Sequence, residues 1–159
     1  MSHNPLIGAF FGGLIGGGYL WGMNYLNRKY NINSKITPPP ENFKYNPEIN
    51  KQFEKLMYFQ NFNTFAFNEA VNNMDQLMQI SKALNEPKAT PHEKDKKLAD
   101  NCYKCTLASI SQLRLSTMNE NDRAEIDVIK NAIDRLAQGY LADVVRKCQH
   151  YRFPYKSNA

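Results

Sequence analysis

The sequence predicts an all-α protein with one N-terminal transmembrane helix and a small bundle of three to four helices. Three observations support this class. The run 5–23 contains no charged side chain, apolar residues from about residue 49 onward recur every three or four positions, and no run alternates strongly enough to require a strand. We therefore expect a membrane anchor at 1–29, a proline- and asparagine-rich linker at 30–48, and a helical domain at 49–159.

The anchor prediction depends on the run from Pro5 to Met23. At a rise of about 1.5 Å per residue, roughly 19 residues cross the ~30 Å hydrocarbon core of a bilayer as a helix. Seven of the eight glycines of the chain lie here. Glycine disfavours helices in water, but in a membrane it allows close packing, so glycines four residues apart predict a face that packs on other membrane-embedded helices. The members of this face are Gly8, Gly12, Gly16, Gly13 and Gly17.

The residues after the run predict its orientation. Trp21 and Tyr25 lie towards its carboxyl end, where amphipathic rings settle at headgroup depth. Arg28 and Lys29 follow, whereas no Lys or Arg precedes the run. By the positive-inside tendency, the amino terminus then faces out, and the helical domain lies on the cytosolic side, the matrix side or an equivalent side.

Three other interpretations of the run stay open. A cleaved signal peptide has positive charge before its apolar core and an A-x-A-like site after it, whereas the charge order here is reversed. A glycine-rich hairpin or flexible tail of a soluble fold would also mix aromatic residues with glycine. A phosphate-binding loop would need the Lys-Ser/Thr of a Walker motif, which G-G-L-I-G-G-G lacks. We prefer the anchor.

Size and charge limit the classes of function. About 110 residues beyond the anchor and linker leave room for one small domain and exclude a two-domain enzyme. All 20 Lys and Arg and all 15 Asp and Glu lie after position 27, so the formal net charge of +5 belongs to the soluble part. This mild excess fits phospholipid headgroups or acidic neighbours at least as well as nucleic acid. Three cysteines, an odd number, favour a reducing or redox-neutral compartment.

The first helical region should begin where Asn46 and Pro47 provide a cap and a first helical position. We expect a bend or a break at 61–64. The apolar pattern then resumes until residues 85–87 stop it.

The last two helices are predicted from a second set of signals. Thr90, Pro91 and Glu93 form a capping-box pattern that starts one helix, which ends near residue 118. A polar turn at 119–122 then leads into a helix of roughly 30 residues that closes at 153–154. Because the connection is short, the two helices should form an antiparallel hairpin.

The pair Cys102 and Cys105 is the motif most suggestive of chemistry. A thioredoxin-type pair lies at a helix N-terminus after a strand, whereas this pair lies about three turns into a predicted helix. Across the hairpin, Cys148 would be on the order of 15 Å away, too far for a disulfide or a shared metal. We interpret the thiols as buried and structural. A redox or disulfide role for the pair, and a cluster of Cys148, His150 and His92, are the alternatives.

The sequence shows no Ser-His-Asp, Cys-His or paired-carboxylate arrangement, so we expect no catalytic residues, no cofactor and no metal. Acidic residues such as Asp127, Asp134 and Asp143 fall off the apolar stripe, as solvated positions do. The aromatic segment 58–67 is either core or a partner-binding surface, and core is the preferred interpretation. Its aromatic residues are Tyr58, Phe59, Phe62, Phe65 and Phe67.

The hairpin also predicts a basic patch at its open end, because the acid-free stretch after residue 143 returns to the start of the preceding helix. Ordinary solvated lysines account for this pattern at least as well as a surface that docks on acidic lipid or an acidic subunit, and we do not expect nucleic acid as a partner. Its members are Lys94, Lys96, Lys97, Arg146, Lys147 and Arg152.

In layout, a single N-terminal span, a proline linker and a small basic helical domain resemble accessory subunits of mitochondrial inner-membrane complexes. The layout also resembles minor capsid proteins that link an internal viral membrane to the capsid shell. The resemblance implies a non-catalytic structural subunit that contacts membrane lipid, other membrane helices and protein subunits of a large assembly, with the mitochondrial inner membrane favoured. The alternatives from other classes are a membrane-tethered thiol redox or metal-binding protein and a basic adaptor for acidic lipid or nucleic acid.

Overall fold

The computed structural model describes residues 39–151, and their side chains through residue 149. Within this range every regular element is a helix, which confirms the predicted helical bundle. The anchor predicted at 1–29 lies outside the described residues. Among the helices of the described range, none combines the length and apolar character that a membrane crossing requires.

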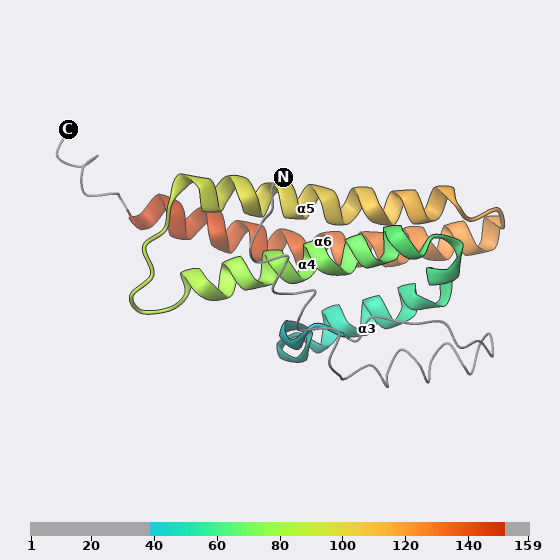
Figure 1. The fold of residues 1–159 in the computed structure, drawn as a ribbon, viewed down its shortest axis with the longest axis horizontal. Helices are drawn as coiled ribbons and strands as arrows, with labels where there is room; N and C mark the ends of the chain where they lie inside the picture. The colour runs from blue at the N-terminus through green and yellow to red at the C-terminus, as the bar shows by residue number, and fades with distance from the viewer. Residues whose placement is uncertain (1–38, 152–159) are drawn as a thin grey trace.

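Four α-helices and two short 3-10 helices make up the described bundle (Figure 1). The central helix is α4, which contacts α5, α6 and both 3-10 helices, while α3 packs on α6. The elements in chain order are η1 (Glu41–Tyr45), α3 (Pro47–Leu56), η2 (Met57–Phe62), α4 (Thr64–Leu84), α5 (Glu93–Leu115) and α6 (Glu120–Tyr151).

Asparagine caps begin the first two α-helices. The Asn46 side chain accepts a hydrogen bond from the backbone N–H of Ile49 at 3.1 Å, and Pro47 is the first helical residue, as predicted. Asn63 caps α4 in the same way through the N–H of Ala66 at 3.0 Å. The predicted break at 61–64 is therefore confirmed as the junction between η2 and α4.

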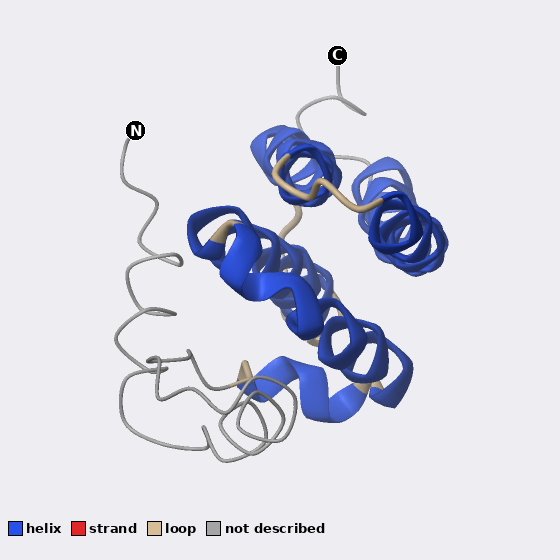
Figure 2. Ribbon diagram, turned by 90° about the vertical axis from the view of Figure 1, so that its right-hand side faces the viewer, coloured by secondary structure: helices blue, strands red, loops and turns tan. Residues whose placement is uncertain are grey.

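The predicted antiparallel hairpin of the last two helices is confirmed by α5 and α6, whose short connection faces the viewer in Figure 2. The predicted start of α5 is wrong by two residues. The helix begins at Glu93, because the backbone N–H of His92 donates to the Asp95 carboxylate at 2.9 Å, so His92 is the cap rather than Thr90. The helix α6 continues through Gly139 without interruption.

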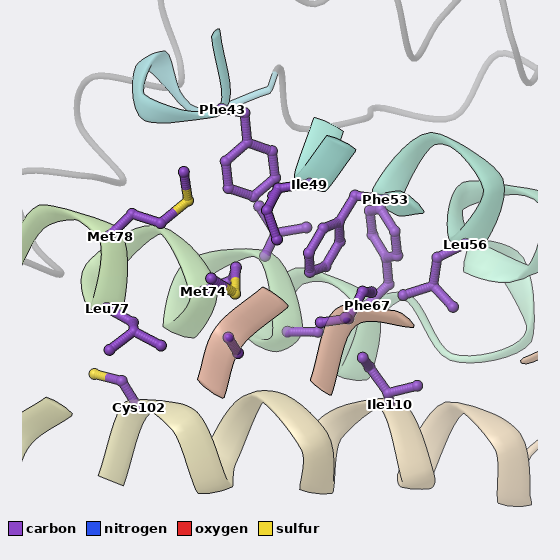
Figure 3. Close-up of a cluster of buried hydrophobic side chains, with 14 of the residues drawn as sticks. Phe43, Ile49, Phe53, Leu56, Phe67, Met74, Leu77, Met78, Cys102 and Ile110 are labelled. Atoms are coloured by element: carbon purple, nitrogen blue, oxygen red, sulfur yellow. The ribbon is translucent and has the colours of Figure 1, made fainter. Parts of the chain in front are cut away.

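The core lies between α4 and the elements on both of its sides (Figure 3). Phe43 and Phe53 are each at most 1% exposed, and their ring centroids are 5.2 Å apart. Phe43 belongs to η1, within the segment that we assigned to the linker. The folded unit therefore begins before residue 49, the domain boundary placed from the sequence.

The aromatic segment 58–67 divides between core and surface. Phe59 and Phe67 are each 1% exposed, whereas Phe62 is 45% and Phe65 is 75% exposed. Tyr58 is half-buried against the core. The preference for core is thus correct for part of this segment only, and two phenylalanine rings remain on the surface.

Candidate functional site: the two ends of the bundle

The predicted membrane residues lie outside the residues that the structure describes. They are Gly8, Gly12, Gly13, Gly16, Gly17, Trp21, Tyr25, Arg28 and Lys29. Of the predicted basic patch, Arg152 also lies outside this range.

The three cysteines are free thiols. Cys102 and Cys148 are buried, and Cys105 is exposed. Burial, with a smaller contribution from the neighbouring Cys105, raises the pKa of Cys102 to about 12. A thiol with this pKa is protonated at neutral pH and is a poor nucleophile or metal ligand. Within residues 39–149, no three His, Cys, Asp or Glu side chains are grouped as a metal site requires.

The fold brings five of the predicted basic residues to one end of the bundle. The Cys148 thiol at the end of α6 donates to the backbone carbonyl of His92 at 3.5 Å, which places the last turns of α6 beside the start of α5. We call this the basic end, and its members are Lys94, Lys96, Lys97, Arg146 and Lys147.

Ion pairs with neighbouring acidic residues reduce the positive charge of the basic end. The Lys96 ammonium nitrogen lies 3.8 Å from a carboxylate oxygen of Glu93, and a guanidinium nitrogen of Arg146 lies 2.6 Å from a carboxylate oxygen of Asp143. The other three lysines have no ion pair within the described part of the chain. The cations available for an external partner are therefore Lys94, Lys97 and Lys147.

Asp143 is a structural contact rather than the solvated acid expected from the sequence. Its side chain is 18% exposed, and it accepts hydrogen bonds from Ser81 Oγ at 2.8 Å and Asn85 Nδ2 at 2.9 Å. Burial raises its pKa, but these two bonds together with Arg146 and Lys147 lower the pKa overall. Asp143 thus fastens the end of α4 to α6 at the basic end.

The opposite end of the bundle carries exposed apolar side chains that the sequence indicated only in part. Phe62 and Phe65 flank the start of α4, while Leu115 and Met118, which are 63% and 84% exposed, lie at the turn between α5 and α6. We call these four residues the apolar end. Leu115 lies two residues after the buried Leu113, off the buried stripe of α5, so its spacing is compatible with exposure, whereas Met118 lies in a polar turn where no periodic pattern applies.

Hydrogen bonds hold the two segments of the apolar end together. Asn63 Nδ2 donates to Ser116 Oγ at 3.1 Å, which joins the start of α4 to the end of α5. The turn itself is fixed because Thr117 Oγ1 donates to the carbonyl of Leu113 at 2.9 Å and Arg123 Nε donates to the carbonyl of Thr117. Thr117 is fully buried. The four apolar side chains therefore project from fixed backbone.

The surroundings of the apolar end are acidic. Residues 114–127 contain four acidic residues and two arginines, and each arginine pairs with one acid. The pairs are Arg114 with Asp127 at 2.7 Å and Arg123 with Glu120 at 3.7 Å. Asp122 and Glu125 have no ion pair among the described residues, so an excess of two negative charges remains beside the apolar side chains.

Comparison with known proteins found no matching family model, and no curated protein or solved structure is significantly similar to this chain. The two ends of the bundle are therefore interpreted from their own chemistry.

Proposed function

We propose that this chain is a non-catalytic, membrane-anchored structural subunit that braces a large membrane-associated assembly. The observation that carries the proposal is the separation of two different surfaces on one bundle. Counted along α5 from Lys94 to Leu115 and along α6 from Glu120 to Lys147, at about 1.5 Å per residue, the basic end and the apolar end lie roughly 30–40 Å apart. A helical bundle whose two ends differ in chemistry is suited to hold two partners at a fixed spacing.

The position of η1 supports a membrane on the side of the basic end. Tyr45 of η1 lies under the Lys82 ammonium at 4.9 Å, in the last turn of α4. The chain that precedes η1 therefore joins the bundle in the half that also contains the basic end. The 15 residues 24–38, between the uncharged run and the described part of the chain, could span at most about 50 Å if fully extended, so a bilayer that held residues 5–23 would be within reach of the basic end.

Charge complementarity supports the same arrangement. Lys94, Lys97 and Lys147 are the cations free of ion pairs at the basic end, and a lysine near an anionic leaflet contributes about 1 kcal/mol of attraction. The mitochondrial inner membrane is our favoured location, because the part of the chain after the uncharged run is basic. An internal viral membrane linked to a capsid shell is the alternative with the same architecture.

The proposal is tested by extraction and co-purification of the full chain. Membranes are washed in alkaline carbonate, then solubilised in a mild detergent, and the native complex is purified through the chain. We expect the full chain to stay in the carbonate-washed membranes and to co-purify with other subunits in fixed ratio. A chain that lacks residues 1–29 is the matched control and should be released by carbonate. Release of the full chain as a monomer would contradict the proposal.

A further inference from the structure

We propose that the apolar end docks a partner protein whose contact segment carries large apolar side chains flanked by Lys or Arg. This inference rests on the proposed function, and it assigns one end of the brace to a class of partner. Four observations carry it: exposure, a fixed backbone, acidic surroundings and distance from the basic end.

Exposure separates the apolar end from the rest of the described surface. The large hydrophobic side chains that are exposed in the described range number six, and four of them belong to the apolar end. The other two, Tyr45 and Val128, lie elsewhere on the bundle, and Tyr45 stacks with Lys82. Gathered apolar side chains of this kind mark interaction sites, because scattered single ones are the norm on soluble surfaces.

The fixed backbone reduces the entropic cost of binding. Asn63 and Ser116 join the two segments, and the buried Thr117 anchors the turn, so the apolar side chains need little ordering when a partner arrives. Large anchors such as Phe65 and Met118 then supply contact area, as the dominant residues of protein interfaces do.

The negative charge around the apolar end favours a protein partner over a lipid surface. Asp122 and Glu125 would repel an anionic bilayer, and Glu69, one helical turn after Phe65, adds a third acid without an ion pair in the described range. The same acids attract Lys and Arg on the rim of a protein partner. Lipid fits the opposite, basic end, whose free lysines carry the complementary charge.

Charge also argues against a second copy at this end. Two apolar ends in contact would bring their acidic residues together, and like charges across an interface are unfavourable. Contact between the apolar end of one copy and the basic end of the next would be heterologous and would continue into a filament. A separate, basic-rimmed protein meets neither difficulty.

The test is site-specific photocrosslinking of the full chain in its native membranes. The photoprobe p-benzoylphenylalanine replaces Phe65 in one variant and Asn131, an exposed polar position on α6, in the control. We expect the probe at position 65 to give a protein adduct that the probe at 131 does not give. The crosslinked peptide, sequenced by mass spectrometry, should contain at least two large apolar residues and a net positive charge.

Two further variants test the chemistry rather than the identity of the adduct. Adding L115S and M118S to the position-65 probe removes anchors, and adding D122K and E125K reverses the charge; each pair should lower the crosslinking yield roughly tenfold. All four side chains are exposed or partly exposed, and an unchanged circular dichroism spectrum confirms that each variant folds. Yields that neither pair lowers would overturn the inference.

An adduct with phospholipid, with a second copy of this chain or with an acidic peptide would also overturn the inference, as would equal yields at positions 65 and 131. A different outcome would contradict the proposed function. If the chain resists carbonate and co-purifies with subunits while position 65 gives no specific adduct, the docking inference alone is wrong. If the chain leaves the membrane as a monomer, the proposed function itself is wrong.

Discussion

Asn42 Nδ2 lies 3.0 Å from Asp75 Oδ1, and this bond joins η1 to the middle of α4. Gln79 Nε2 donates to the other carboxylate oxygen at 2.8 Å. Asp75 is 1% exposed, and burial raises its pKa to about 6, although the bonds from Asn42 and Gln79 lower it. The folded protein therefore favours the protonated carboxyl more than the unfolded chain does.

The burial of Asp75 predicts an unusual dependence of stability on pH. Because the folded pKa of Asp75 is raised from 3.8 to about 6, its contribution to stability is fully present below pH 3.8 and is lost as pH rises through 6. The corresponding loss is on the order of 3 kcal/mol. We expect the free energy of unfolding of the wild type, measured by urea denaturation in mild detergent, to fall between pH 4 and 7.5 relative to Asp75→Asn. Parallel pH profiles of the two proteins would refute the assignment.

The cap of α4 provides a second prediction. Asn63 accepts from the N–H of Ala66 and donates to Ser116 Oγ, so Asn63→Ala removes a helix cap and a tertiary bond. The expected loss in the free energy of unfolding is about 1–2 kcal/mol. Asn61 is exposed in η2, and its side chain makes no hydrogen bond among the described residues, so Asn61→Ala should change stability by less than about 0.5 kcal/mol. Equal losses in the two variants would contradict the role of Asn63.

The cysteines provide a third prediction, which also addresses the thiol redox alternative. Cys105 is exposed, whereas Cys102 is buried with a pKa of about 12 and Cys148 is buried with a pKa that burial, then Asp95 and Glu93, raise. In native protein, a maleimide should label Cys105 within minutes and the other two only after unfolding. The variant Cys105→Ser should lose the fast reaction entirely. Fast labelling of Cys102 in the native state would instead favour a redox function.

How far the sequence predicts this fold depends on whether a signal is local. The α5–α6 hairpin follows from a long run of apolar residues at helical spacing and a short turn, both readable from consecutive residues. The sequence predicts the start of α5 two residues too early, because two capping patterns overlap. In the structure the Asp95 carboxylate accepts a hydrogen bond from the backbone N–H of His92, so the cap is His92 and not Thr90. The burial of Phe43 is not predictable from the sequence, because the neighbouring residues are proline, asparagine and charged residues. The ring that it packs against, Phe53, lies on another element.

The apolar end shows the same limit for the candidate site. Residues 58–67 were identified as aromatic-rich, but η2 is a 3-10 helix, in which residues three apart are aligned, so Phe59 and Phe62 stack with centroids 6.4 Å apart. One ring is then buried and the other lies toward the surface. Leu115 and Met118 join them only because the hairpin turn meets the start of α4, and this contact is tertiary.

The free lysines of the basic end predict binding to anionic vesicles. For a chain lacking residues 1–29, reversing Lys94, Lys97 and Lys147 to Glu should weaken binding to phosphatidylserine vesicles at low salt by at least about tenfold, because each lysine contributes about 1 kcal/mol. Co-sedimentation with phosphatidylcholine vesicles serves as the lipid control. The matched triple reversal of Lys51, Lys55 and Lys130 changes the net charge equally but lies away from the basic end. An equal effect of both triple variants would mean that net charge, and not this end, determines binding.

The paired residues Phe65 and Phe67 provide the last prediction, because they differ in exposure and not in type. Phe67 is 1% exposed in the core, so Phe67→Ala should cost about 3–5 kcal/mol of unfolding free energy through lost burial and the cavity that remains. Phe65 is 75% exposed, so Phe65→Ala should change stability by less than about 0.5 kcal/mol. Urea denaturation of both variants under the same conditions measures the difference. If Phe65→Ala proves as costly as Phe67→Ala, then Phe65 is a structural residue, and the apolar end loses the side chain that most distinguishes it as a docking surface.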